Sequence, residues 1–282
     1  MREFLSFSRK NKVVGFCLIV VVLFLLIALF APYITPRDPF AMSLRDRLVP
    51  PGRNFLLGTD ELGRDVFSRI ILGTRISLFI SVAAVLLAYV VGSLAGITAA
   101  WRGGLIDNLI MRAIDVWLSF PYLLMAIIII SIFGTGALNL ILAIALWIMP
   151  NFTRIVRGCV LSIKETDYVE AARAIGGNSL HIIVRHVLPN YSALVIVYAT
   201  LYVSRAIILE AALSFLGLGL QPPTPSWGLM ISVGRTYIRV APHIVLIPGI
   251  VITLAVLAFN IVGDGLRDAL DPRLRGAEGG RA

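Results

Sequence analysis

The stretch Ile76–Trp101, ISLFISVAAVLLAYVVGSLAGITAAW, contains no charged residue. A helix needs about 20 predominantly apolar residues to cross the hydrocarbon core of a bilayer, and this stretch is long enough. Four further runs are also free of Asp, Glu, Lys and Arg: Val13–Pro36, Val116–Thr153, Val187–Ser204 and Val240–Gly263. Val116–Thr153 is too long for one span, and its turn residues Gly134-Thr135-Gly136 predict two helices that part there. The fifth span is expected to continue past Arg205. The sequence therefore predicts an all-α integral membrane protein with six transmembrane helices.

The composition of the whole chain agrees with this prediction. Hydrophobic residues make up 58% of the 282 residues, charged residues make up 15%, and the mean hydropathy is +0.90. Soluble domains carry about 25% charged residues, so a soluble enzyme is excluded, and the high apolar content excludes a disordered chain. The net charge of +9 is typical of cytoplasmic loops in a membrane protein, and since no nucleic-acid-binding motif occurs, we expect no nucleic-acid partner.

The distribution of basic residues predicts the orientation. Met1–Lys12 carries four basic residues before the first apolar run, which is longer than a signal-peptide core of 7–15 residues and lacks a small-x-small cleavage site, so we expect an uncleaved first helix. Six spans place both ends on one side, and the positive-inside rule favours the cytoplasm, although the arginine-rich first outer loop runs against it. The expected organisation is a cytoplasmic tail (1–12), one six-span domain (13–263) with an outer loop (37–75) and an inner segment (154–186), and a second cytoplasmic tail (264–282).

Motifs for catalysis and metal binding are absent. None of the three lysines (Lys10, Lys12 and Lys164) follows a glycine, so the chain has no phosphate-binding loop for ATP. His-Glu-x-x-His, Gly-x-Ser-x-Gly and Cys-x-x-Cys do not occur either. His181 and His186 are five residues apart, which does not place them on one face of an α-helix, so no metal site is expected. We predict no catalytic residue, no metal and no cofactor on this chain.

The segment between the fourth and fifth spans, Asp167–Ser179 (DYVEAARAIGGNS), has a different character. Asp167 followed by Glu170 is typical of a helix start. Gly176-Gly177 predicts the helix end, because glycine adopts positive φ at little cost, and Asn178 or Ser179 can begin a second short helix. Each of these roles is common in ordinary proteins, so the local pattern alone leaves open whether the segment is functional.

The spacing Glu170-Ala171-Ala172, Gly176 and Leu188-Pro189 resembles the cytoplasmic signature of bacterial ABC importer permeases. His186 departs from the resemblance, because the family usually has an aliphatic residue there. Three further stretches narrow the resemblance to the second permease of dipeptide and oligopeptide importers, the DppC/OppC type: Leu57–Arg69, Leu213–Gly228 and Asn260–Pro272.

The resemblance implies the fold of a type I importer permease in the bacterial inner membrane, with both termini in the cytoplasm. It implies that the chain pairs with a homologous DppB/OppB-type permease, that two cytoplasmic ATPases carry ATP and Mg, and that an extracytoplasmic binding protein delivers a peptide. The residues expected to couple to an ATPase are Glu170, Ala171, Ala172 and Gly176. The loop residues expected to face the binding protein are Asp60, Gly63, Arg64 and Asp65. Related permeases carry nickel, glutathione, opines or oligosaccharides, so these substrates stay open.

A second Glu-Ala-Ala triplet, Glu210-Ala211-Ala212, falls in or near the fifth span, close to Arg205. A glutamate within the membrane is a candidate functional residue. The alternative, which we favour, is that Glu210 and Arg205 pair and stabilise the bundle. Two other functions were weighed: a membrane-embedded enzyme, which would need a reactive cluster that the sequence lacks, and a scaffold or receptor, which would not need the ATPase-coupling segment.

Overall fold

A computed structural model describes residues 11–270 of the chain. Within these residues the structure is helical and contains no strand. The α-helices are α2 (Lys12–Ile34), α3 (Val66–Arg102), α4 (Gly104–Leu118), α5 (Tyr122–Phe133), α6 (Ala137–Lys164), α7 (Asp167–Ala174), α8 (Ser179–Ile182), α9 (Leu188–Phe215), α10 (Trp227–Gly234) and α11 (His243–Leu270). Short 3-10 turns occupy Leu44–Asp46 and Arg235–Tyr237, and a π-helix occupies Ile183–Val187. The predicted all-α fold class is confirmed. The predicted tails lie largely outside the described residues.

Five of these helices are long and apolar enough to cross a membrane, namely α2, α3, α6, α9 (from Leu194) and α11. The sixth candidate is a broken one, because α4 and α5 meet at an angle of 92°. The span expected from Val116 is thus not one continuous helix, because the chain breaks between Leu118 and Tyr122. Pro121 precedes the first residue of α5, and proline has no N–H with which to continue a helix. The predicted separation at Gly134-Thr135-Gly136 is confirmed, since α5 ends at Phe133 and α6 begins at Ala137.

Several helix bounds differ from the charge-free runs, and α6 for example continues past Thr153 to Lys164. α3 begins at Val66, well before Ile76, because the side chain of Asp65 accepts a hydrogen bond from the backbone of Ser68 and caps the helix. α11 continues beyond Gly263 to Leu270, so charged residues extend a helix that apolar residues begin. As expected, α9 continues past Arg205, and it ends at Phe215. The first loop is correspondingly shorter than 37–75.

The centre of the bundle is the contact between α3 and α6. Small residues recur at every fourth position of α3 and are buried: Ala84, Ala88, Gly92, Gly96 and Ala100. A Cβ on Gly92 would lie 2.8 Å from the Met149 carbonyl oxygen, and a Cβ on Gly96 would lie 2.6 Å from that of Thr153. The two helix backbones therefore touch directly, as is common where small residues face each other in membrane helices.

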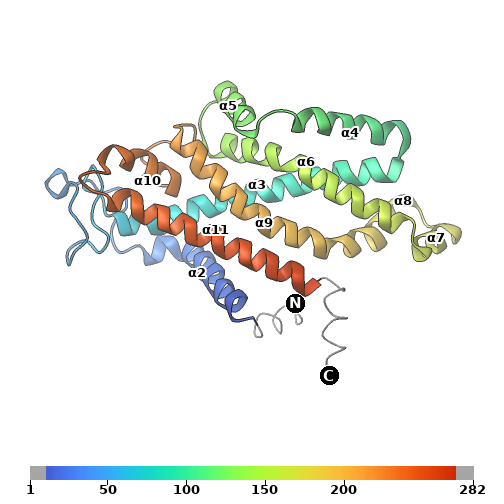
Figure 1. Ribbon diagram of the computed structural model, residues 1–282, viewed down its shortest axis with the longest axis horizontal. Helices are drawn as coiled ribbons and strands as arrows, with labels where there is room; N and C mark the ends of the chain where they lie inside the picture. Colours follow the sequence, from blue (N-terminus) through green and yellow to red (C-terminus); the bar gives the residue numbers. More distant parts are fainter. Residues whose placement is uncertain (1–10, 271–282) are drawn as a thin grey trace.

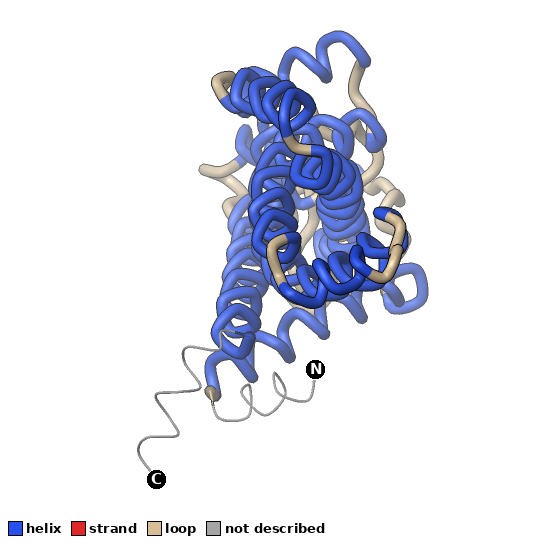
Figure 2. Tube along the Cα trace, turned by 90° about the vertical axis from the view of Figure 1, so that its right-hand side faces the viewer, coloured by secondary structure: helices blue, strands red, loops and turns tan. Residues whose placement is uncertain are grey.

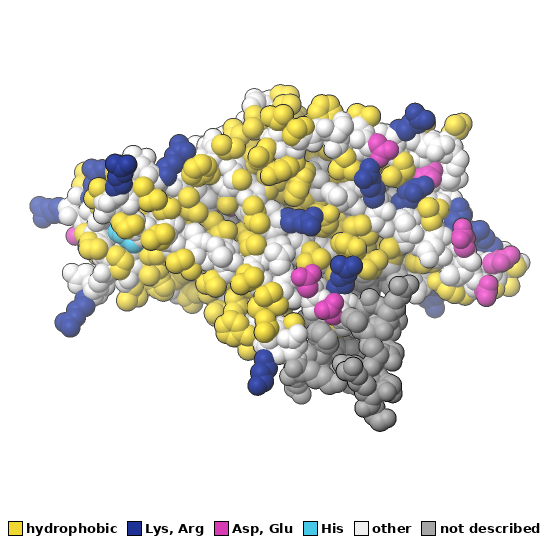
Figure 3. Space-filling model, viewed as in Figure 1, with side chains coloured by type: hydrophobic (Ala, Val, Ile, Leu, Met, Phe, Trp, Pro, Cys, Tyr) yellow, Lys and Arg dark blue, Asp and Glu magenta, His cyan; other side chains and the backbone are white. Residues whose placement is uncertain are grey.

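The long helices run along one axis and leave two chemically different ends (Figure 1). The loop between α2 and α3 lies at one end beside α10, and α7 and α8 lie at the other. Figure 2 looks along this axis and shows the helices as a closed bundle, with α4 and α5 outside it. Figure 3 shows mainly apolar side chains over the middle of one face, with a few charged ones among them, and more charged residues towards the two ends. This distribution fits a bundle whose middle lies in lipid.

Candidate functional site

The segment that joins α6 to α9 forms an elbow, here defined as residues 165–187. Thr166, not Asp167, is the N-cap of α7, and Asp167 and Glu170 both lie in the first turn, where the helix dipole favours acidic side chains. At the other end Gly176 has φ +89°, its N–H donates to the Arg173 carbonyl (3.0 Å), and the Gly177 N–H donates to the Ala172 carbonyl (2.9 Å). These two bonds form a Schellman motif, so the predicted glycine helix end is confirmed.

The Glu-Ala-Ala triplet divides between two faces of α7. Val169 and Ala172 are buried against the bundle, whereas Glu170, Ala171 and Gly176 are exposed. Sequence reasoning missed two large apolar side chains on the exposed part of the elbow: Ile175 is 88% exposed and Leu180 is 71% exposed. Apolar residues that flank a glycine turn would have been a usable signal, because a solvated turn rarely needs them. The elbow thus presents apolar side chains beside a carboxylate, the composition of a protein-binding surface.

The elbow is attached to the end of α3. The Lys164 ammonium donates to the carbonyl oxygens of Ala100 (3.1 Å) and Trp101 (3.0 Å), which are among the last carbonyls of that helix. The guanidinium of Arg173, on α7, lies 4.9 Å from the centre of the Trp101 ring. A cation over an aromatic ring is attracted by its π-face. Displacing α7 would therefore pull directly on α3.

The histidines of the elbow do not lie as predicted. The His181 and His186 ring centres are 6.3 Å apart, and the His186 ring lies 6.2 Å from that of Tyr168. The expectation that the two histidines point to different faces is wrong, because a π-helix at Ile183–Val187 brings positions five apart to one face. Within the residues that the structure describes, no group of three or more His, Cys, Asp or Glu side chains could hold a metal ion.

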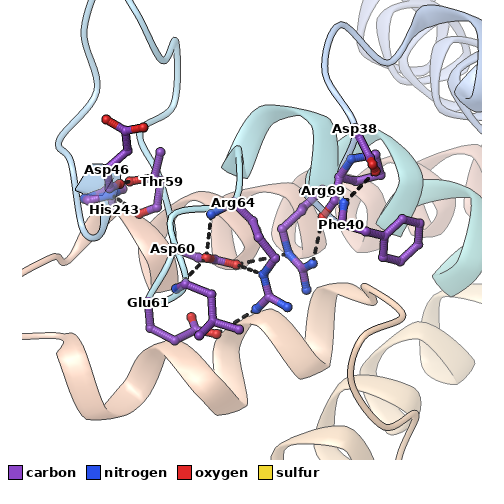
Figure 4. Close-up of polar contacts among 11 residues, drawn as sticks. Asp38, Phe40, Asp46, Thr59, Asp60, Glu61, Arg64, Arg69 and His243 are labelled. Atoms are coloured by element: carbon purple, nitrogen blue, oxygen red, sulfur yellow. Dashed lines mark hydrogen bonds and ion pairs between the residues drawn. The ribbon is translucent and has the colours of Figure 1, made fainter. Parts of the chain in front are cut away.

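At the opposite end, Asp60, Glu61, Arg64 and Arg69 form the loop-end cluster (Figure 4). Asp60 Oδ2 lies 2.6 Å from Arg64 Nε and 3.4 Å from Arg69 Nε, and all three side chains are only 4% exposed. Asp60 Oδ1 also accepts hydrogen bonds from the backbone N–H groups of Leu62 and Arg64. Glu61 Oε1 pairs with Arg64 Nη2 at 2.7 Å, yet burial raises the pKa of the Glu61 carboxyl, helped by the charge of Asp60.

The other two loop residues singled out by the sequence have local roles. Gly63 has φ +74°, and a Cβ there would lie 1.8 Å from the Ser43 carbonyl oxygen, so glycine is required by both backbone and space. Asp65 caps α3 through the backbone N–H of Ser68 (2.8 Å) and its hydroxyl (2.6 Å). Together with the buried loop-end cluster, Gly63 and Asp65 therefore set the conformation of the loop and the positions of its exposed residues.

The expected pair between Glu210 and Arg205 is not formed in the described part of the chain. Glu210 is completely buried and accepts hydrogen bonds from the hydroxyls of Ser214 (2.9 Å) and Ser77 (3.4 Å). Arg205 is exposed and lies over the Tyr202 ring at 5.1 Å. Side chains five positions apart on an α-helix point about 140° away from each other, since each residue turns the helix by about 100°. Glu210 instead links α9 to α3.

Comparison with known proteins places this architecture in a family. The model of the binding-protein-dependent transport system inner membrane component matches residues 88–276, and that of the N-terminal TM domain of oligopeptide transport permease C matches residues 2–51. The glutathione transport system permease protein GsiD of Pectobacterium atrosepticum is 43% identical over 276 residues, which are 97% of this chain and 91% of that protein. The di/tripeptide transport system permease protein DppC of Pseudomonas aeruginosa is 44% identical over 283 residues, covering 98% and 93% of the two chains.

A solved structure supports the fold. The MetNI methionine ABC transporter, in an inward-facing conformation, aligns with a TM-score of 0.57 and 17% identity, covering 72% of this chain and 96% of that chain. An identity this low shows the fold alone, but the fold agrees with what the much closer sequence relatives indicate. The chain therefore belongs to the family of binding-protein-dependent transport system inner membrane components and is a permease subunit of the ABC importer class.

Proposed function

We propose that this chain forms, together with a homologous permease of the DppB/OppB type, the path by which di- or oligopeptides enter a bacterial cell across its inner membrane. The substrate class is supported by the relatives, one of which is named as a di/tripeptide permease. Glutathione, itself a tripeptide, is the second candidate, because another relative of similar identity is named as a glutathione permease.

The observation that carries the proposed coupling is the exposed elbow. It presents Glu170, Ala171, Ile175 and Leu180 to the surroundings while Val169 and Ala172 anchor it to the bundle. An apolar protrusion of this kind fits a groove in a cytoplasmic ATPase. ATP and Mg then reside on two such ATPase subunits. Hydrolysis of this ATP moves α7. Through Trp101 this movement reaches α3, and through the α3–α6 contact it reaches the rest of the bundle.

The loop end then faces outwards, towards a substrate-binding protein. The loop-end cluster is buried, so its role is to hold the loop in one shape rather than to touch that protein through its ion pairs. In this orientation both chain ends lie in the cytoplasm. The start of α2 supports this, because Val14 packs against Gly265 near the end of α11, so both described ends lie together.

The coupling proposal is tested by comparing the two Glu-Ala-Ala triplets. Single cysteines replace Ala171 or Ala211 in a chain whose Cys17 and Cys159 have been changed to serine, and a membrane-impermeant thiol reagent is applied from the cytoplasmic side. Position 171 is exposed and should react in the permease alone and become protected when the ATPases bind. Position 211 packs against Gly228 near the loop end and should not respond to the ATPases. Protection at 211 and none at 171 would overturn the assignment.

The substrate is tested separately, with the chain assembled with its partner subunits in vesicles. Labelled dipeptide, tripeptide and glutathione are offered with the binding protein, and accumulation is measured with and without ATP inside. ATP-dependent uptake of a peptide supports the proposal, and uptake of none of the three contradicts it while leaving the coupling test intact.

A further inference from the structure

A groove of about 350 Å³ runs between α2 and α3 on the outside of the bundle. Its walls are apolar and come from both helices: Leu25, Ala28, Leu29, Phe79, Val82 and Ala83. Several of the side chains at its rim are largely exposed, including Leu29 (67%) and Phe79 (65%). The volume lies within the range of about 300–1,000 Å³ typical of sites for small molecules.

One charged residue, Arg75, completes the lining of this groove. In the part of the chain that the structure describes, its guanidinium has no hydrogen bond, ion pair or aromatic contact, and its side chain is exposed. Two other arginines of the spanning helices do have partners, since Arg69 pairs with Asp60 and Arg205 lies over Tyr202. An unpaired cation on a membrane helix is costly unless an anion or water reaches it.

Arg75 lies within α3, beyond the level at which the loop-side ends of α2 and α3 meet. The backbone N–H of Arg37 donates to the Ser68 hydroxyl (3.2 Å), so the loop-side ends of α2 and α3 meet at this level. Arg75 lies seven residues further along α3, which corresponds to about 10 Å at 1.5 Å per residue. A long arginine side chain at this depth extends towards the headgroup region while its aliphatic part stays in the apolar layer.

We propose that this groove is a binding site for an anionic phospholipid of the loop-side leaflet, with the lipid phosphate against the Arg75 guanidinium and one acyl chain between α2 and α3. The two parts of the site match the two parts of the ligand. A guanidinium binds a phosphate through two parallel hydrogen bonds, and the apolar walls accept hydrocarbon. The groove lies far from the elbow along the helix axis, so the site is independent of ATPase docking.

The test uses membranes that contain the full-length chain with its partner subunits. A phosphatidylglycerol with a photoactivatable diazirine in one acyl chain is compared with the same probe as phosphatidylcholine, and crosslinked peptides are identified by mass spectrometry. Peptides of α2 and α3 that line the groove should crosslink to phosphatidylglycerol about fivefold more than to phosphatidylcholine, the ratio expected for one basic residue near an anionic lipid.

Two kinds of variant separate charge from shape. Arg75→Ala should lower the phosphatidylglycerol yield to that of phosphatidylcholine, whereas Arg75→Lys keeps the charge and should retain most of the preference. Ala83→Phe fills the groove and should lower the yield of both probes. Ala95→Phe makes the same change at a half-buried position of α3 outside the groove and should have no effect.

Two results would overturn the proposal. Equal yields for the two probes, unchanged in Arg75→Ala, would show that the groove does not select an anionic lipid. Crosslinking of a photoreactive residue at position 79 to the partner permease, with no lipid adduct, would show that a protein helix occupies the groove. Recovery of each variant in complex with its partners is measured alongside, and Arg75→Lys keeps the test decisive if Arg75→Ala fails to assemble.

Discussion

Replacing Gly96 with alanine should separate the two central helices. Its Cβ would lie 2.6 Å from the Thr153 carbonyl oxygen, 3.0 Å from the Arg157 backbone nitrogen and 3.1 Å from the Val156 Cβ. Two of these atoms belong to the backbone of α6, so no side-chain rotation relieves the contact and the helices must move apart. Overpacking of this kind costs about 1–3 kcal/mol. Alanine regains about 1 kcal/mol of helix propensity, so the expected net loss is up to about 2 kcal/mol, and Gly96→Ala should be less stable than a glycine-to-alanine change without the clash by about 1–3 kcal/mol.

The measurement is unfolding of the purified full-length chain by titration with SDS, followed by circular dichroism. Gly158→Ala is the matched control, because Gly158 is also inside a helix of this pair, is exposed, and has nothing within 4 Å of its added Cβ. It should leave the chain as stable as the wild type or stabilise it by up to about 1 kcal/mol. If Gly96→Ala proved as stable as Gly158→Ala, the direct backbone contact between α3 and α6 would be refuted.

Two further predictions concern the two ends of the bundle. Gly176→Val should insert normally into the membrane but reduce uptake strongly, because φ +89° costs a β-branched residue at least about 1–2 kcal/mol. Gly176→Asn should retain most uptake, since asparagine tolerates this conformation. Equal uptake by the two variants would contradict the prediction. Asp60→Ala should destabilise the chain by about 3–5 kcal/mol, because it leaves Arg64 and Arg69 buried without their shared carboxylate. Unfolding by SDS measures this loss of stability. A loss under about 1 kcal/mol would show that the ion pairs do not hold the loop in place.

The predictions of the spans and of the elbow rest on properties of single residues and of their near neighbours in the sequence. Absence of charge over Ile76–Trp101 is enough to predict a membrane helix, and glycine at 176 is enough to predict a helix end at positive φ. The loop glycine Gly63 was named only because the family resemblance implied that its loop faces a binding protein, and neither its positive φ nor the close approach of Ser43 was anticipated. The small-residue stripe from Ala84 to Ala100 was missed, although its period of four matches one helix face and is visible in the sequence.

The predictions that failed all concerned partners or helix continuity. Arg205 and Glu210 are close in sequence, yet Glu210 is hydrogen-bonded by Ser77, 133 residues away, and Arg205 lies on another face. The two histidines of the elbow were assigned to different faces because an ordinary α-helix was assumed, and one π-helical turn reverses that result.

For this protein the sequence alone determined the membrane environment, the helical class and the place of the elbow, because hydrophobicity and backbone preference are properties of single residues and their near neighbours. Only the tertiary structure decided that Arg173 lies over Trp101, that Asp60 is shared by two arginines and that Arg75 is left without a partner beside an apolar groove. These facts depend on which helix faces approach each other. That choice is made by the packing of the whole bundle, in which α3 and α6 approach so closely at Gly96 that an added Cβ would lie 2.6 Å from the Thr153 carbonyl oxygen.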